Sequence, residues 1–134
     1  MYTITSRKNI IICSPESFLQ FLPPPSFFLE NSINIELFDT VPPHELAEKL
    51  TSIGYRSSFT IEEPGTFSKK GEVFDIYPTS HGPIRINYDD DIIEKIKSID
   101  TDTNKSNKED MIESLTIGPA PYIFSNEVFR NNLR

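Results

Sequence analysis

The chain has 134 residues, of which 37% are hydrophobic and 25% are charged, and this composition predicts a single modest hydrophobic core. Its formal net charge of −7 at pH 7 opposes tight nonspecific binding to nucleic-acid phosphates. No apolar run approaches the ~20 residues of a membrane span, and none matches a signal peptide. The single cysteine, Cys13, excludes an intrachain disulfide and a cysteine zinc cluster, so we expect a cytoplasmic setting.

The first part of the chain predicts one strand followed by one short helix. Residues 10–13 are a continuous apolar run that ends in Cys13, which is typical of a strand buried on both faces and predicts a buried, inert thiol. Residues 14–17 offer a capping serine and a proline suited to the first helical position, so a helix is expected to begin there. The three prolines at 23–25 are expected to end it. Residues 1–25 therefore predict one strand–helix edge of an α/β unit and not a complete fold.

The middle of the chain predicts a strand and then the best-defined helix. Residues 33–37 alternate between apolar and polar, which is the pattern of a half-buried strand. Residues 44–53 place apolar side chains, including Leu46 and Leu50, on one face of a helix. Gly54 follows at once and is expected to end the helix as a left-handed cap.

From residue 55 the pattern changes to short strands separated by tight turns. Five strands are expected, at residues 57–61, 72–77, 84–88, 92–99 and 111–117, with a polar surface loop at 100–110. The third should direct Ile84, Ile86 and Tyr88 to one face and Arg85 to the other. Short connections favour antiparallel pairing. We therefore expect an α+β domain in which a mostly antiparallel sheet is covered by the helix at 44–53, with α/β-type segments at both ends.

No arrangement of residues in the sequence predicts catalysis. The chain has neither a glycine-rich phosphate loop nor the dinucleotide-binding glycine pattern. His44 and His81 lie at a helix start and in a turn, and the three aspartates at 89–91 lack the spaced oxygen ligands of a calcium loop. We therefore expect no catalytic residue, cofactor, metal site or small-molecule substrate. A small enzyme with an unrecognised active site remains the alternative.

Three positive charges are the most informative polar residues. Lys69 and Lys70 precede the strand at 72–77, and Arg85 is central in the next strand. If these strands are neighbours, Lys70 and Arg85 share the solvated face, where a basic spot can bind an acidic patch on a partner protein. Ordinary solvated lysines are the alternative. Asp75 is unusual within a strand, so we expect it to hydrogen-bond to a neighbouring loop.

An ordered series of short motifs begins at Gly54. It comprises Gly54-Tyr55, Glu63-Pro64-Gly65-Thr66-Phe67-Ser68, Lys70-Gly71-Glu72-Val73-Phe74-Asp75-Ile76-Tyr77-Pro78, Pro83-Ile84-Arg85-Ile86, Asp90-Asp91-Ile92-Ile93-Glu94-Lys95-Ile96 and Ile117-Gly118-Pro119-Ala120. The series covers residues 44–121 and resembles the UvrB-like interaction domain of bacterial transcription-repair coupling factors, the Mfd family. The excision repair helicase UvrB carries a related domain. The motifs at 54–55 and 63–65 favour a coupling factor over UvrB.

The resemblance implies a division of the chain into three parts. Residues 1–33 would be the strand–helix flank of a degenerate helicase-like domain, residues 34–121 the interaction domain, and residues 122–134 a C-terminal flanking segment. The chain would then be a non-enzymatic piece of a much longer protein. That parent is expected to be an ATP-dependent DNA translocase, which contacts RNA polymerase and DNA through other domains.

The resemblance also implies docking of UvrA, the damage-recognition ATPase, in transcription-coupled nucleotide excision repair. Two arginines that contribute to this contact in the family correspond to Lys70 and Arg85, and a lysine keeps the charge but loses the planar bidentate fork. An aromatic residue of some relatives corresponds to Asp89, for which Tyr88 is the candidate substitute. The expected partner-binding set is Lys69, Lys70, Arg85, Tyr88 and Asp89. The equivalent UvrA-binding domain of UvrB is the first alternative.

Overall fold

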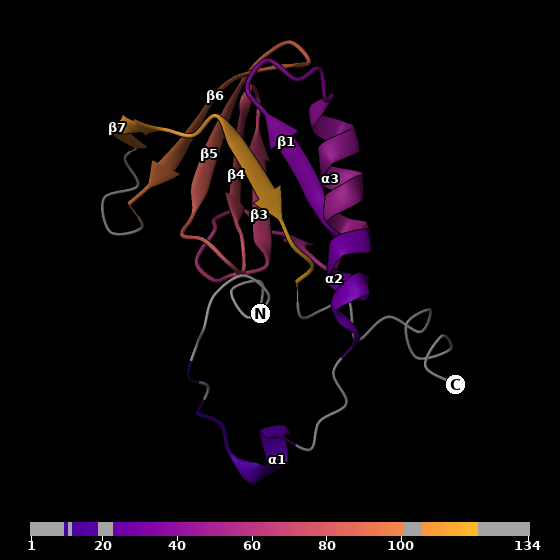
Figure 1. The fold of residues 1–134 in the computed structure, drawn as a ribbon. Helices are drawn as coiled ribbons and strands as arrows, with labels where there is room; N and C mark the ends of the chain where they lie inside the picture. The colour runs from indigo at the N-terminus through magenta and orange to yellow at the C-terminus, as the bar shows by residue number, and fades with distance from the viewer. Residues whose placement is uncertain (1–9, 11, 19–22, 101–105, 121–134) are drawn as a thin grey trace.

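The computed structural model describes residues 10, 12–18, 23–100 and 106–120, which form two sheets and three helices (Figure 1). The helices are α1 (Pro15–Phe18), α2 (Pro25–Glu30) and α3 (Pro43–Ser52). The strands are β1 (Ile33–Glu36), β2 (Arg56–Ser57), β3 (Thr66–Lys70), β4 (Val73–Tyr77), β5 (Ile84–Asp89), β6 (Ile92–Ile99), β7 (Ser106–Met111) and β8 (Ser114–Ile117).

The larger sheet has six strands in the order β2-β3-β4-β5-β6-β7. Each neighbouring pair is antiparallel except β2 and β3, which are parallel. The smaller sheet pairs β1 antiparallel with β8, so that segments about 80 residues apart in the sequence lie side by side. The expected α+β class, with a mostly antiparallel sheet and a covering helix, is confirmed.

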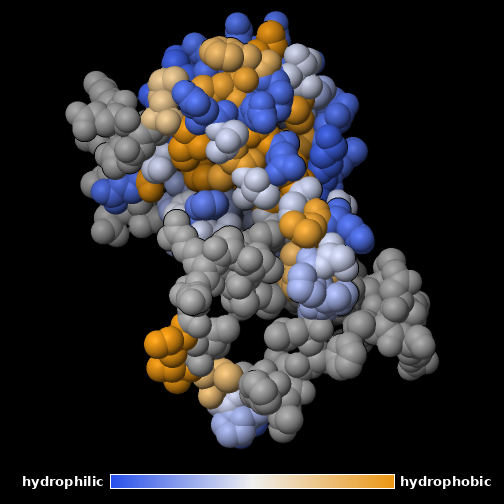
Figure 2. All heavy atoms as spheres, in the orientation of Figure 1, coloured by the Kyte–Doolittle hydropathy of each residue, from blue (hydrophilic) through white to orange (hydrophobic). Residues whose placement is uncertain are grey.

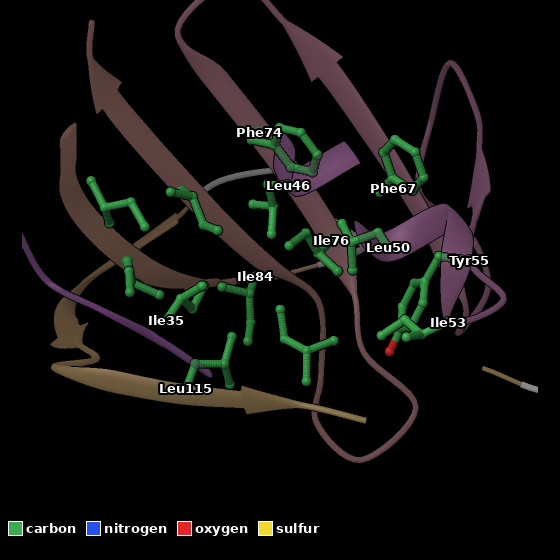
Figure 3. Packing of buried hydrophobic residues seen from close by; sticks show 14 of the residues in the cluster. Ile35, Leu46, Leu50, Ile53, Tyr55, Phe67, Phe74, Ile76, Ile84 and Leu115 are labelled. Carbon is green, nitrogen blue, oxygen red and sulfur yellow. The ribbon is translucent and has the colours of Figure 1, made fainter. Parts of the chain in front are cut away.

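One face of the six-stranded sheet is buried beneath two covers, and we call it the core face. Helix α3 lays the fully buried Leu46 and Leu50 on this face, with Leu46 near Phe74 and Leu50 near Ile76 (Figure 3). The β1–β8 pair brings Ile35 and Leu115 over the other part of the same face. Burial of these apolar side chains is the main force that holds the two sheets and α3 together. We call the opposite side of the sheet the outer face.

Helix α3 confirms the expectation of a helix at 44–53, displaced by one residue. Its end is a complete Schellman motif, because Gly54 N–H donates to the Thr51 carbonyl at 3.1 Å and Tyr55 N–H donates to the Leu50 carbonyl at 2.9 Å. Gly54 has a φ of 94°, a conformation that a side chain would strain.

Figure 2 looks onto the side that carries β1 and β8, and it shows hydrophilic residues along α3 and hydrophobic residues near the centre of that side.

The prediction of a strand at residues 10–13 is wrong. Residues 10, 12 and 13 belong to no strand, and Ile10 and Ile12 are 95% and 94% exposed. A strand buried on both faces needs neighbours on two edges, and no described strand pairs with this segment. Cys13 is exposed, so the expectation of a buried thiol is also wrong. The short helix expected from 14–17 is present as α1, which stands apart from the sheets in Figure 1.

Helix α2 is an element that the sequence did not predict. The prolines at 23–25 suggested only a stop, but Pro25 occupies the first helical position, where its missing N–H costs nothing.

The prediction of a strand at 57–61 is wrong beyond its first residue, because β2 ends at Ser57 and the chain then leaves the sheet. Strand β3 was not predicted, since two lysines end it and its apolar alternation is short.

The region after residue 99 also differs from the prediction. Residues 106–110 were expected in a loop but lie in β7 at the edge of the larger sheet. The single strand expected at 111–117 is broken at residues 112–113, and its second half becomes β8 of the smaller sheet. The predicted flanks at 1–9 and 122–134 lie outside the described residues. Within the described part of the chain, no helix has the length and hydrophobicity that a bilayer crossing requires.

Candidate functional site

The outer face of the sheet carries a row of polar side chains across four strands. The strand register aligns Ser68 with Asp75, Asp75 with Arg85, and Arg85 with Lys97. Side chains that are paired directly across antiparallel strands point to the same face, so these four residues form one line. Lys70 is two residues from Ser68 on β3 and therefore also points outward. The expectation that Lys70 and Arg85 share the solvated face agrees with this register.

Arg85 and Asp75 form a two-pronged ion pair at the centre of this row. Arg85 donates from Nε to Asp75 Oδ1 at 2.7 Å and from a terminal nitrogen to Asp75 Oδ2 at 2.8 Å. The side chains are 25% and 12% exposed, respectively. These hydrogen bonds raise the pKa of the Arg85 guanidinium, although its partial burial acts in the opposite direction. Asp75 was expected to bond to a loop; it binds its cross-strand neighbour instead, because the two residues are in register.

A loop between β2 and β3 folds back over the outer face and forms one wall of a cleft. The cleft has a volume of about 400 Å³ and is lined by Phe59, Thr60, Ile61, Glu62, Ser68, Lys70, Val73, Asp75, Pro83, Arg85 and Ile99. Lys70 Nζ lies 4.1 Å from the ring centroid of Phe59, which is 81% exposed. This distance is within the range of a cation–π interaction. The cleft thus brings together an exposed aromatic ring, an ammonium group and the Arg85–Asp75 pair.

The remaining residues of the expected partner-binding set lie elsewhere. Lys69 is exposed, but it pairs with Phe74 in the register and therefore points toward the side of the core face. Asp89 is exposed at the end of β5, where it pairs with Ile92. The five residues therefore do not form one cluster; Lys70 and Arg85 are the two that the structure brings to the cleft.

Tyr88 does not reach the surface, and its expected role as a surface aromatic is corrected. It is only 3% exposed and points to the core face with Ile84 and Ile86, as the alternation of β5 requires. Burial raises the pKa of Tyr88 to about 12, with a smaller contribution from the charge of Asp91. Its hydroxyl has no hydrogen-bond partner among the described residues.

Phe59 and Lys97 belong to this site but were not predicted. Lys97 was within reach of sequence reasoning, because the alternation of a strand at 92–99 puts it on the face opposite Ile96. Phe59 gave no comparable signal, since its position depends on where β2 ends and the loop turns back. His44 and His81 are exposed and lie on separate elements, and the described residues contain no group of three or more metal-ligating side chains.

Comparison with known proteins relates the chain to DNA repair proteins. The model of the UvrB interaction domain family matches residues 33–122. The transcription-repair-coupling factor of Bacillus subtilis is 32% identical over 119 residues, which is 87% of this chain and 10% of that protein. The factor of Staphylococcus haemolyticus is 28% identical over 94% of this chain and 11% of its own length. The UvrABC system protein B of Kosmotoga olearia is 33% identical over 93% of this chain and 19% of its own length. The chain therefore spans about a tenth of the length of the coupling factors that it matches.

Proposed function

The chain belongs to the UvrB interaction domain family, and we propose that it is the docking module through which a transcription-repair coupling factor recruits UvrA in nucleotide excision repair. One observation carries this proposal: Lys70 and Arg85, on different strands, line the same open cleft on the outer face. On this face Lys70 and Lys97 take part in none of the salt bridges among the described residues, and these positive charges on a chain of net charge −7 favour an acidic partner surface. The same net charge disfavours nucleic acid as the direct ligand of this domain.

The binding surface in this proposal is narrower than the set suggested by the sequence. It contains Lys70 and Arg85, with Lys97 beside Arg85 in the strand register. Asp89 is left out because it lies at the end of β5 and does not line the cleft. Lys69 is left out because it points away from the cleft, and Tyr88 is left out because it is buried. Arg85 acts here mainly through the nitrogens that Asp75 does not occupy, since a guanidinium has five N–H donors and the pair uses two.

The proposal assigns docking, and no chemical step, to this domain. The parent protein would supply the DNA translocase and the contacts with RNA polymerase and DNA through other domains, as the resemblance to coupling factors implies. The second candidate is the equivalent UvrA-binding domain of UvrB. The observation that supports this second candidate is the 33% identity to the UvrABC system protein B of Kosmotoga olearia.

The experiment is a binding titration of the full 134-residue chain with UvrA from the same organism. We expect saturable binding that weakens as salt is raised above ~0.15 M, because exposed charge pairs are screened. The informative variants are Lys70→Glu and Lys69→Glu, which make the same charge change at adjacent residues with opposite orientations. Arg85→Glu is a poorer probe, because it places a second carboxylate beside Asp75 and is expected to disturb folding.

The paired variants separate docking from general electrostatics. We expect Lys70→Glu to weaken binding at least tenfold, which is ~1.4 kcal/mol, and Lys69→Glu to weaken it less than threefold. Equal losses in both variants would show that only net charge matters and would contradict a docking site at the cleft. Absence of binding by the unaltered chain would contradict the proposed function itself.

A further inference from the structure

We propose that Phe59 and Lys70 act together as an aromatic–cation anchor that binds an acidic segment of the partner protein, an inference that rests on the docking function proposed above. Phe59 is 81% exposed, although its ring lies only 4.1 Å from Lys70 Nζ. The fold gains little apolar burial from this ring, so the ring is available for contact with a partner. The pairing assigns two roles to Phe59: it contacts the partner directly, and it positions the Lys70 ammonium group.

The loop backbone around Phe59 is fixed to the sheet, so the ring is presented from a defined position. Ser58 N–H donates to the Phe67 carbonyl at 2.8 Å, and Ser68 Oγ donates to the Phe59 carbonyl at 3.0 Å. These two bonds hold the loop on either side of the Phe59 Cα while its side chain stays outside. A preorganised aromatic side chain loses little conformational freedom on binding, and such residues carry a large share of the energy in protein interfaces.

The charge of Lys70 indicates what the anchor binds. Among the salt bridges of the described residues none includes Lys70, whereas Arg85 is already neutralised by Asp75. Lys70, an exposed residue of the cleft lining, therefore offers a positive charge that a partner carboxylate complements. Covering the Phe59 ring with apolar atoms of the same partner segment removes water from the pair, and a cation–π contact becomes stronger when it is desolvated.

Lysine at position 70 explains why an aromatic neighbour is useful. A lysine side chain has a flexible stem of four carbons, and its ammonium group is a point charge without the fixed fork of arginine. The ring of Phe59 restricts the position of this charge, so that less side-chain freedom is lost when a carboxylate binds. Loss of the ring is therefore expected to weaken the contribution of Lys70 as well as the direct contact of Phe59.

The test uses the full chain and UvrA, with Phe59→Ala, Phe59→Leu, Phe59→Trp, Lys70→Ala and the double variant Phe59→Ala/Lys70→Ala. Leu29→Ala is the matched control, because Leu29 is 74% exposed on α2 and lies away from the cleft. We expect Phe59→Ala to weaken binding at least tenfold, Phe59→Leu at least threefold, and Phe59→Trp less than threefold. Lys70→Ala is expected to add less than a twofold loss in the Phe59→Ala background, and Leu29→Ala is expected to change nothing.

The possible outcomes distinguish this inference from the docking function. If UvrA binds the unaltered chain and Phe59→Ala equally well, the anchor is overturned while the docking function stands. If Phe59→Leu and Phe59→Trp bind alike, the cation–π role is overturned. If sedimentation shows a dimer of the chain that Phe59→Ala dissociates, the occupant is a second copy and the acidic-partner assignment is overturned. If the unaltered chain fails to bind UvrA at all, both proposals are overturned.

Discussion

The two faces of the six-stranded sheet are built from the same strands but obey different constraints. On β5, Ile84 and Ile86 are 2% and 0% exposed on the core face, whereas Arg85 between them points outward and pairs with Asp75. The core face is specified by volume and apolar character, because α3 and the β1–β8 pair close over it. The outer face is specified by charge and by one exposed aromatic ring. The comparison teaches that burial fixes the architecture, while the open face, which burial does not constrain, carries the residues that we propose for partner binding.

The largest expected effect is on the core face. Phe74→Ala should reduce the free energy of unfolding by ~3–5 kcal/mol, because Phe74 is fully buried and stacks on Phe67 at a ring distance of 5.6 Å. Phe59→Ala is the control, since it removes the same side chain from an exposed position and should cost less than ~1 kcal/mol. Urea unfolding followed by circular dichroism measures both. Similar losses in the two variants would contradict the division into a core face and an outer face.

The Arg85–Asp75 pair tests whether the outer face also contributes to stability. Arg85→Met should lower the free energy of unfolding by ~1–3 kcal/mol, because it leaves the carboxylate of Asp75, 12% exposed, without its two hydrogen bonds. The double variant Asp75→Asn/Arg85→Met should recover part of this loss, since no charge is then left unpaired. Urea unfolding of Arg85→Met, Asp75→Asn and the double variant gives the coupling energy. A coupling energy near zero would show that the ion pair does not contribute to the stability of the fold.

The buried Tyr88 is expected to make the stability that the core face provides depend on pH. The unfolded chain loses the Tyr88 proton near pH 10, whereas burial raises the pKa of the folded state to about 12. The contribution of Tyr88 to stability is therefore fully present below pH 10 and is lost as the pH rises toward 12; the expected loss at pH 11 is about 1 kcal/mol. Tyr88→Phe should remove this part of the decline and be nearly neutral at pH 8, because the hydroxyl has no partner among the described residues. Urea unfolding at pH 8 and pH 11 gives the free energy of unfolding of both proteins. An equal loss between these pH values in the unaltered chain and in Tyr88→Phe would contradict the assignment.

The smallest effect on stability is expected at Lys97, on the outer face. Lys97→Gln should change the free energy of unfolding by less than ~0.5 kcal/mol, because the side chain is half-buried and takes part in no salt bridge among the described residues. The same variant should weaken UvrA binding severalfold if the outer face docks the partner. Thermal melting and the binding titration separate the two effects. A large loss of stability without loss of binding would reverse the roles assigned to the two faces.

The core face was more predictable from sequence than the outer face. Alternation placed Ile84, Ile86 and Tyr88 on one side of β5, and helical spacing placed Leu46 and Leu50 toward the sheet; both predictions are confirmed. These patterns are local and depend only on the period of the element. Strand β7 escaped prediction because its sequence is polar, so that its presence depends on pairing with β6 and not on an apolar pattern.

The outer face could be predicted only in part because it depends on register. That Lys70 and Arg85 face outward follows from alternation, but the ion pair of Arg85 with Asp75 depends on how β4 and β5 are aligned. The connection of six residues between these strands allows several alignments, and the sequence alone does not select one. The position of Phe59 over Lys70 depends further on a loop whose course is set by hydrogen bonds to β3.

The most direct test of the docking account is site-specific photo-crosslinking to UvrA. The photoreactive amino acid p-benzoylphenylalanine would replace Lys97 on the outer face in one protein and Lys49 on α3 in another. Both positions lie on the described surface, but they belong to opposite sides of the sheet. The account predicts a crosslink to UvrA from position 97 and none from position 49. A crosslink from position 49 alone would contradict it, because the partner would then cover α3 and leave the outer face open.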